Sequence, residues 1–196
     1  MRTRDTSKEE LVKQKAIEML VKQGIEGFGM NRLAKESGVS VATLYIYYAD
    51  KEDLIKKIAI EIGQDFFREM LKDFSADMHF AEGLRKQWEN RANFMMENPN
   101  EVACWEVLQN SCHSEFITEE SIKDFKNTMT EFFQNAVERK EVAEISKSVF
   151  WSIAYGPLYS LLRFHNKGKS MSGAPFTLTK EIQDEAFELV IKALRP

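Results

Sequence analysis

The sequence predicts an all-α protein of about nine helices, with an N-terminal three-helix helix-turn-helix domain followed by a larger helical domain. Apolar residues recur at helical spacing along nearly the whole chain, and no segment shows the strict alternation of a β-strand. Two short helical segments meet at a tight turn near the N-terminus, which is typical of a helix-turn-helix unit. Of the 196 residues, 43% are hydrophobic and 30% are charged, so the chain can bury a sizeable core.

The first helix is expected to begin at Ser7 and to end near Gly24. Ser7 and Glu10 have the spacing of a capping box, in which the serine oxygen accepts from the backbone N–H of Glu10 and the glutamate reaches back. Glycine is common directly after a helix. The inward face of this helix is an apolar stripe at positions i, i+4, i+7 and i+8, formed by Val12, Ala16, Met19 and Leu20.

The next three helices are marked by their ends. A short helix is expected over residues 30–36, and Ser37-Gly38 breaks it. Ser40 caps the following helix, which lasts barely two turns to about Tyr48. Asp50 caps the fourth helix, which is long and is predicted to run to about residue 74. Its apolar residues repeat every four positions, at Leu54, Ile58, Ile62, Phe66, Met70 and Phe74.

A repeat of four drifts around a helix of 3.6 residues per turn, so this stripe should contact several neighbours in succession. We therefore interpret the fourth helix as a long helix that packs against both of two domains, residues 1–53 and residues 54–196. The remaining helices are expected at 80–97, 99–111, 118–140, 145–165 and 179–194, separated in part by a loop over residues 166–177.

Proline and capping residues support these helix assignments. Pro99 is well placed at the first position of its helix, and Thr118 can cap the next one while Ile117 contacts Ile122. Pro157 lies inside a helix, where it removes one backbone hydrogen bond and predicts a kink.

Charge and composition limit the classes of function. The net charge is −4, but residues 1–57 hold 11 Lys+Arg against 9 Asp+Glu, so any polyanion is expected at the N-terminal part. No apolar run approaches the about 18 residues that a membrane span needs, and the polar N-terminus lacks the apolar stretch of a signal peptide. We therefore expect a cytoplasmic protein that needs no cofactor.

Cysteine usage gives little sign of metal or redox chemistry. Cys104 and Cys112 do not form a C-x-x-C motif, and His113 beside Cys112 is the one hint of a metal or thiol site. Two ordinary buried thiols on a helix are the simpler interpretation, and we predict no metal site.

The third helix has an uncharged outward face. On a helical wheel Leu44 and Tyr48 share the inward face, whereas small or apolar groups point outward and Tyr45 and Tyr47 lie on the flanks. Small side chains let a helix sink into a DNA major groove, and hydroxyls can bind the phosphates on either wall together with Lys51. Packing at a domain junction would also explain three tyrosines.

The residues favour the first interpretation. The stretch from Gly24 to Leu54, GIEGFGMNRLAKESGVSVATLYIYYADKEDL, resembles the DNA-binding domain of the TetR family of bacterial repressors. The matching positions are the glycine turn, Leu33-Ala34, Gly38-Val39-Ser40, Thr43-Leu44-Tyr45, the aromatic pair Tyr47-Tyr48, and Lys51 before an acidic residue.

The resemblance implies an all-helical homodimer that places its third helix in the major groove of an operator and releases DNA when a small molecule binds the C-terminal domain. By position, phosphate contacts are implied for Tyr45, Tyr47 and Lys51. The implied surface for reading bases is Val41, Ala42, Thr43 and Ile46, and Ser40 at the start of the helix belongs to the predicted DNA-binding surface.

This sequence also departs from the family. Val41 stands where relatives often have lysine or arginine, Gly29 stands where a threonine or serine often caps the second helix, and Tyr48 replaces the commoner phenylalanine. The apolar side chains at 41, 42 and 46 favour contact with thymine methyl groups over hydrogen bonds to guanine.

The larger domain is rich in aromatic residues, which could line a cavity for a small, largely apolar effector or could simply be core. The last two helices, about 145–165 and 179–194, are the dimerisation elements that the resemblance implies, with Gly156 and Ser160 permitting close approach. The candidate ligand-pocket residues are Trp88, Arg91, Met95, Trp105, Gln109, Phe125, Met129, Phe132, Trp151 and Tyr155.

We therefore predict a ligand-responsive DNA-binding regulator, a repressor released from its operator by its effector. One alternative is a helical enzyme acting on a small apolar substrate, but the sequence has no G-x-S-x-G, no H-E-x-x-H and no phosphate loop. The other alternative is a DNA-binding regulator without a ligand, controlled by a protein partner.

Overall fold

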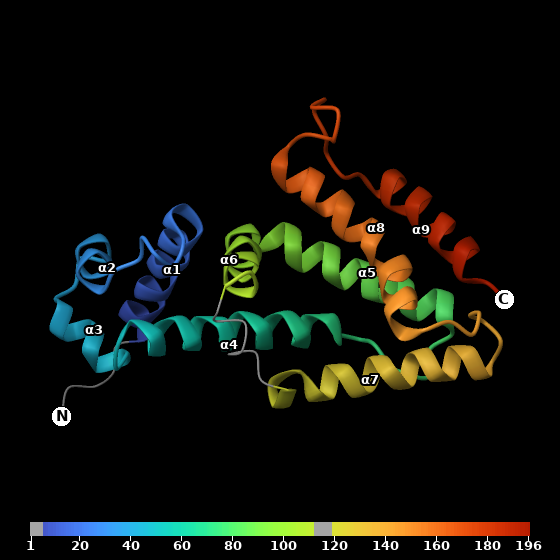
Figure 1. Ribbon diagram of the computed structural model, residues 1–196, viewed down its shortest axis with the longest axis horizontal. Coiled ribbons are helices and arrows are strands. Elements are labelled where there is room, and N and C mark those ends of the chain that lie inside the picture. Colours follow the sequence, from blue (N-terminus) through green and yellow to red (C-terminus); the bar gives the residue numbers. More distant parts are fainter. Residues whose placement is uncertain (1–5, 112–118) are drawn as a thin grey trace. The chain divides into compact units, whose positions relative to one another are not determined.

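The computed structural model describes residues 6–111 and 119–196, and in this part the chain is all-α, as predicted. Figure 1 shows the helices in chain order. Apart from one isolated β-bridge between Lys169 and Pro175, no strand pairing occurs in these ranges. The helices are α1 (Thr6–Gln23), α2 (Met30–Glu36), α3 (Val41–Tyr47), α4 (Lys51–Met70), α5 (Phe80–Glu97), α6 (Pro99–Gln109), α7 (Glu119–Glu138), α8 (Lys147–Lys167) and α9 (Lys180–Leu194).

The chain forms two compact units. The first unit consists of Met1–Asp65 and Asn98–Ile122, and the second consists of Phe66–Glu97 and Lys123–Pro196. The division therefore falls within α4, and α6 belongs to the first unit. The predicted domain boundary at residues 53/54 stays a prediction. The first segment of the N-terminal unit extends to Asp65, which is beyond that boundary.

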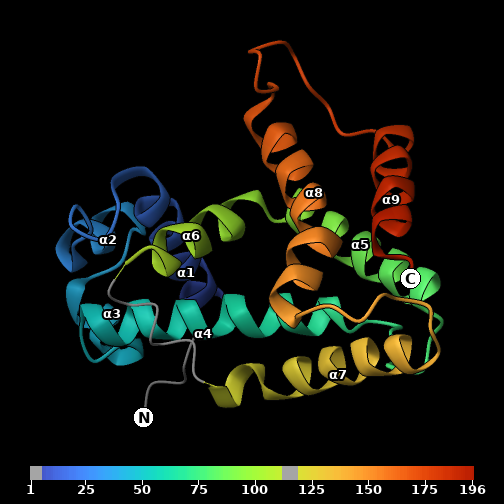
Figure 2. The ribbon, with the colours of Figure 1, turned by 45° about the vertical axis from the view of Figure 1, so that its right-hand side comes forward.

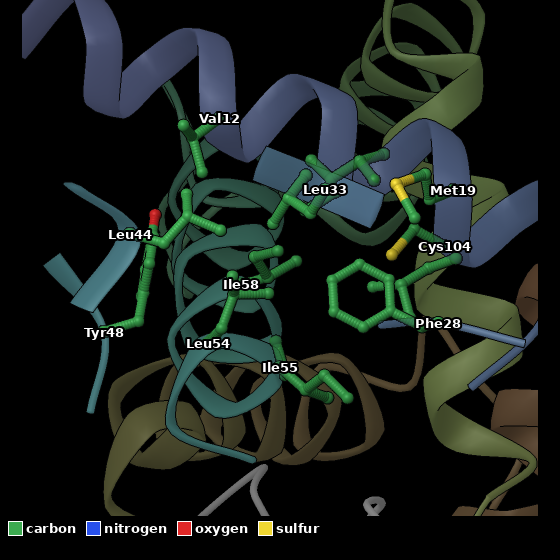
Figure 3. Close-up of a cluster of buried hydrophobic side chains, with 14 of the residues drawn as sticks. Val12, Met19, Phe28, Leu33, Leu44, Tyr48, Leu54, Ile55, Ile58 and Cys104 are labelled. Atoms are coloured by element: carbon green, nitrogen blue, oxygen red, sulfur yellow. The ribbon is translucent and has the colours of Figure 1, made fainter. Parts of the chain in front are cut away.

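The first unit is built on one hydrophobic cluster (Figure 3). Val12 of α1, Leu33 of α2 and Leu44 of α3 are fully buried around Leu54 and Ile58 of α4. Helix α6 packs along α1 and adds the buried Cys104 to this cluster. Burying each of the larger aliphatic side chains stabilises the unit by about 1.5–3 kcal/mol.

The predicted helix starts are found at three caps. Ser40 Oγ accepts from the backbone N–H of Thr43 at 3.1 Å, and Asp50 Oδ1 accepts from that of Asp53 at 2.8 Å. Thr179 Oγ1 accepts from the N–H of Ile182 at 3.4 Å. Gly29 precedes α2 without any side-chain hydrogen bond to the helix, in keeping with its departure from the family pattern.

Glycines with positive φ follow two of the helices in the first unit. Gly24, with φ +67°, follows α1, and Gly38, with φ +65°, lies in the turn between α2 and α3. This left-handed region disfavours side chains with a Cβ, so these positions suit glycine. The glycine at position 38 therefore allows the tight turn that orients α3 relative to α2.

The end of α4 is four residues earlier than predicted. The carbonyl of Met70 accepts hydrogen bonds from Gln87 Nε2 at 2.6 Å and from Asn90 Nδ2 at 3.1 Å, and Asn90 also donates to the carbonyl of Lys72 at 2.8 Å. Asp73 then has a positive φ of 51°. Side chains from α5 therefore satisfy the carbonyls that a longer α4 would have used, and the apolar repeat to Phe74 gives no sign of this.

The second unit is held together by aromatic packing between α5, α7 and α8. Phe133 and Phe150 have ring centroids 4.5 Å apart, and Phe132 contacts both Phe74 and Phe80. Gly83 of α5 lies directly against the Phe132 ring. Figure 2 gives a second view of α5, α7, α8 and α9.

Helix α8 continues through Pro157 and ends at Gly168, whose φ of +66° forms the left-handed cap. It therefore ends two residues after the predicted limit at His165, and it also begins two residues later than predicted. Thr118, Ile117, Cys112 and His113, on which predictions were made, lie outside the described residues. In the described ranges, no helix is both long enough and apolar enough to cross a membrane.

Candidate nucleic-acid interface and ligand site

Helix α3 buries one face and exposes the other. Leu44 is fully buried, whereas Tyr45 is 52% exposed and Ile46 is 59% exposed. Ala42 is exposed as well, and Val41 and Thr43 are half-buried. Figure 3 shows Leu44 and Tyr48 on the side of the hydrophobic cluster. The outward face predicted from the sequence is therefore open, and it carries no charged side chain.

The start of α3 is fixed by a pair of hydroxyls. Ser40 caps the helix, and its Oγ lies 2.8 Å from the Oγ1 of Thr43. The two predicted contact residues thus hold each other in place. A rigid arrangement lowers the entropy lost when such a surface binds a partner.

The structure places Tyr47 differently from the sequence prediction. It is only 6% exposed, whereas the prediction put it on an exposed flank with Tyr45. Tyr47 follows Leu44 by three residues and Tyr48 follows it by four, so the two rings lie on either side of the inward face. Their centroids are 6.4 Å apart in an edge-to-face contact. Tyr47 is therefore part of the core of this unit.

The turn between α3 and α4 is fixed by charged groups. Asp53 Oδ2 accepts from the backbone N–H of Ala49 at 2.8 Å and from Lys57 Nζ at 2.9 Å. These two donors hold the pKa of Asp53 below its ordinary value, the backbone bond being the larger effect. Lys57 also donates to the carbonyl of Tyr47 at 3.0 Å and so binds the last residue of α3.

Lys51 lies at the first position of α4. Its Nζ donates to the carbonyl of Ile25 at 2.8 Å, which ties it to the glycine turn before α2. An ammonium group has three N–H donors, so this bond leaves donors for another acceptor. Its position is thereby fixed at the N-terminus of α4, four residues after the end of α3.

In the second unit, Arg91 of α5 is fully buried among aromatic rings. Its Nε donates to Tyr159 Oη at 3.1 Å, and its Nη1 donates to the carbonyl of Gln87 at 3.1 Å and to Gln87 Oε1. The guanidinium carbon lies 4.2 Å from the ring centroid of Tyr155 and 5.8 Å from those of Phe125 and Trp151. Cation–π attraction of this kind stabilises a buried guanidinium.

Comparison with known proteins agrees with this geometry. Residues 14–58, which include α2 and α3, match the family model described as "Bacterial regulatory proteins, tetR family". The chain is 26% identical over 180 residues to an uncharacterized HTH-type transcriptional regulator of Haemophilus influenzae, covering 90% of both proteins. It is also 29% identical over 100 residues to an HTH-type transcriptional regulator of Staphylococcus aureus, covering 54% of that protein.

Solved structures show the same fold. A TetR family transcription regulator from Marinobacter aquaeolei superposes with a TM-score of 0.76 at 25% identity, covering 99% of this chain and 98% of that one. A TetR-family regulator from Haemophilus influenzae superposes with a TM-score of 0.72 at 22% identity, and each chain is covered fully, at 100%.

The chain belongs to the TetR family. This TetR-family protein is a DNA-binding transcriptional regulator and not an enzyme. The family resemblance and the helix-turn-helix prediction are thereby confirmed.

The candidate ligand-pocket residues of this TetR-family regulator are divided between its two units. Trp105 and Gln109 lie on α6 in the first unit, where Trp105 packs against the hydrophobic cluster. The other eight belong to the second unit, where Trp151, which is 38% exposed, is the only one of them that is not buried. Phe132 is enclosed by Phe74 and Phe80, and Trp88 Nε1 donates to the carbonyl of Ala154 at 2.8 Å. These two have clear roles in packing.

Sequence reasoning missed three features of this regulator. Lys57 was not singled out, although its spacing of four residues from Asp53 is a readable sign of an ion pair. The sequence gives no sign that the buried Arg91 has no carboxylate partner among the residues that the structure describes. A pocket of about 150 Å³ between α5 and α9 contains only Trp88 from the predicted set, and its lining is Arg85, Trp88, Glu89, Ala92, Asn93, Lys180, Gln183, Asp184 and Phe187.

That pocket is bordered by an ion-pair cluster. Arg85 pairs with Asp184 at 2.6 Å and with Glu188 at 3.1 Å, and its guanidinium lies 4.0 Å from the ring centroid of Phe187. These contacts tie α5 to α9. Within residues 6–111 and 119–196, no three His, Cys, Asp or Glu side chains gather as a metal site would require. Cys104 is a free thiol whose burial raises its pKa to about 12.

Proposed function

We propose that this protein is a repressor that inserts α3 into the major groove of its operator. The observation that carries the proposal is the open, uncharged face of α3, with Ala42, Tyr45 and Ile46 exposed while Leu44 is buried. A helix with small or apolar outward side chains fits a groove about 12 Å wide. The same face contains Ser40, Val41 and Thr43, which we include in the DNA-binding surface.

Phosphate binding is proposed for Lys51, Tyr45 and Tyr47. Lys51 is the strongest of these, because it is a cation whose side chain is held at the N-terminus of α4 by its bond to the Ile25 carbonyl. Tyr45 has an exposed ring and can donate from its hydroxyl. Tyr47 can contribute only through the edge of a buried ring. The N-terminus of α4 adds less than its dipole suggests, because Asp50 already accepts from the N–H of Asp53.

Sequence reading is proposed to depend on apolar contact. Ile46 and Ala42 are exposed and have no hydrogen-bonding side-chain groups, and Val41 is half-buried beside them. Such side chains contact the C5-methyl group of thymine, whereas guanine is usually read by arginine or lysine. Replacing contacted thymines by uracil should therefore weaken binding, and unchanged affinity would contradict this assignment.

Control is proposed to come from a small, largely apolar effector in the second unit, in a homodimer formed through α8 and α9. A ligand that binds one arrangement of the dimer better than another shifts the protein toward that arrangement and releases the operator. Helices α8 and α9 pack against each other and keep half-exposed apolar residues, among them Ile153, Ile182 and Leu189. We place the regulator in the cytoplasm, where its DNA is.

The test is a gel shift with the DNA that flanks the protein's own gene, carried out over a range of salt concentrations. Lys51→Ala should weaken binding to all sequences alike and lower the slope of log affinity against log salt by about 1. Lys123→Ala, at an exposed position on α7 and outside the proposed interfaces, is the matched control and should change neither quantity. An unchanged affinity and slope in Lys51→Ala would refute the phosphate contact.

A further inference from the structure

Arg91 is a buried cation without a partner of opposite charge. Its side chain is fully buried, and among the residues that the structure describes no carboxylate pairs with it. Its Nε and Nη1 donate to neutral oxygens, whereas Nη2 has no hydrogen-bond partner. A buried charge normally has a counter-ion, because its desolvation is costly. The two N–H groups of Nη2 therefore call for an acceptor.

The hydroxyl of Tyr155 is a second hydrogen-bond donor without an acceptor among the described residues, and it belongs to a ring that contacts Arg91. The Tyr155 hydroxyl is buried and has no hydrogen-bond partner among the described residues, and the ring centroid lies 4.2 Å from the guanidinium carbon. Burial raises the pKa of Tyr155 to about 12, so its phenol keeps its proton at neutral pH and can donate it. Only three buried side-chain groups in the described part lack a partner, and two of them are neighbours here.

The surroundings of this pair are aromatic. The Phe125 and Trp151 rings each lie 5.8 Å from the guanidinium carbon, and the two rings meet edge to face at 6.2 Å. Trp151 also contacts Tyr155 at 4.6 Å and reaches the surface. The groups that can bind a ligand are thus the aromatic rings, which are apolar, and the guanidinium of Arg91, which is cationic.

We propose that the effector is an apolar molecule with a single carboxylate, which accepts hydrogen bonds from Arg91 Nη2 and Tyr155 Oη. This rests on the proposed function, because it gives the chemical class of the effector for the same unit. A carboxylate only accepts hydrogen bonds, and its one negative charge matches one guanidinium. A neutral apolar ligand would leave both donors unmet. A dianion would exceed the charge available.

The same polar network reaches the end of α4. Gln87 Oε1 accepts from Arg91, and Gln87 Nε2 donates to the carbonyl of Met70, the last residue of that helix. A carboxylate that draws Arg91 toward itself therefore acts on the group that terminates α4. The other end of α4 begins with Lys51, one of the proposed phosphate contacts.

The first experiment compares acids with alcohols of the same skeleton by calorimetry. Octanoate and 3-phenylpropionate are titrated into the full-length protein beside octan-1-ol and 3-phenylpropan-1-ol. Charge-assisted hydrogen bonds are stronger than those between neutral groups, so at least one acid should bind about tenfold or more tightly than its alcohol. If no acid binds more tightly than its alcohol, the proposal is overturned. Tighter binding of octyl phosphate than of octanoate would overturn the carboxylate in favour of a phosphate.

The second experiment removes one donor without disturbing the fold. Tyr155→Phe deletes a hydroxyl that makes no hydrogen bond to any described residue, so the thermal stability of the variant should be equal to or above that of the wild type. Its affinity for the acid should fall about tenfold, while its affinity for the alcohol stays the same. Arg91→Met should abolish the preference for acids. Wild-type acid affinity in Tyr155→Phe contradicts the site.

Operator binding separates this proposal from the proposed function. Without ligand, Tyr155→Phe should bind operator as the wild type does, because Tyr155 belongs to the second unit. If the acid binds through Arg91 but leaves the operator complex intact, the carboxylate site stands and effector-driven release fails. If neutral molecules release the operator and acids do not, release stands and the carboxylate site fails.

Discussion

Tyr45 and Tyr47 lie two residues apart on α3 and have very different surroundings. Tyr45 is exposed, so Tyr45→Phe should leave the stability within about 0.5 kcal/mol of the wild type. Operator affinity should nevertheless fall, because a hydrogen bond to a charged phosphate contributes about 1.5–3 kcal/mol. Fluorescence anisotropy with labelled operator measures the loss, and thermal melts provide the stability control.

The paired change Tyr47→Phe tests the less accessible hydroxyl. Its ring stays in the core, and operator affinity should fall by the same amount only if the edge of that ring reaches a phosphate. Equal affinities for wild type and Tyr45→Phe would remove Tyr45 from the interface. Equal affinities for wild type and Tyr47→Phe would leave Tyr47 as a core residue alone.

Asp53 makes the turn before α4 sensitive to acid. Its pKa is held below the ordinary value of about 3.9 by the Ala49 N–H and then by Lys57, so it is lower in the folded state than in the unfolded state. The stability that Asp53 contributes is therefore complete above the unfolded pKa and is lost as the pH falls through the folded pKa. Asp53→Asn should melt below the wild type at pH 7.

The difference between the two melting temperatures should narrow as the pH falls below about 4, the unfolded-state pKa of an aspartate. Thermal melts monitored by circular dichroism at several pH values measure it. Asp124→Asn, the same change at an exposed position on α7, should show no such narrowing. A difference for Asp53→Asn that stays constant over this range would contradict the assigned role.

At the scale of elements, α5 packs so closely on α7 that one methyl group matters. A Cβ at position 83 would overlap the Phe132 ring and lie 3.2 Å from the Phe74 ring. Gly83→Ala gains about 1 kcal/mol of helix propensity, but overpacking costs about 1–3 kcal/mol. Since the overlap involves a ring that is enclosed by other rings, we expect net destabilisation in urea unfolding.

With a smaller side chain at position 132, Gly83→Ala should no longer lower the free energy of unfolding. In a Phe132→Leu background the ring is gone, so Gly83→Ala should become neutral or stabilising. The double-mutant cycle isolates the contact between the two positions. Additive effects would show that Gly83 is not limited by Phe132.

Several elements could be predicted because their signals are local. The caps at Ser40, Asp50 and Thr179 depend on one side chain and the three residues after it. The end of α4 could not be predicted, since it depends on Gln87 and Asn90 far along the chain. Local chemistry sets where helices start, and tertiary hydrogen bonds decided where this one stops.

The candidate sites divide in the same way. The open face of α3 follows from the position of Leu44. Tyr47 lies near the border between the buried and exposed faces, so a small error in the orientation of the helical wheel placed it on an exposed flank, whereas it is buried. The pocket prediction rested on aromatic content, which does not separate a wall from a core, so Trp105 was grouped with residues of the other unit. That no carboxylate in the described part of the chain pairs with Arg91 is a property of the packed structure alone.

At the scale of the whole molecule, the proposed homodimer depends on the outer faces of α8 and α9. Leu189 of α9 is 60% exposed, on the same side of the helix as the half-buried Ile182 and Ala186. A leucine left in water next to other apolar groups is typical of a protein contact surface. Two such surfaces related by a twofold axis would form a four-helix arrangement.

Leu189→Glu should therefore convert the protein to a monomer in light scattering coupled to gel filtration, with an unchanged circular dichroism spectrum. Lys123→Glu makes a larger change of charge at an exposed position on α7, outside the proposed contact surface, and should leave the dimer intact. The monomer should also lose most of its operator affinity, since a dimer binds two half-sites about 34–36 Å apart, or a multiple of that spacing, and a single unit binds one. A wild-type protein that is already monomeric, or a Leu189→Glu variant that stays dimeric, would place the contact between subunits elsewhere.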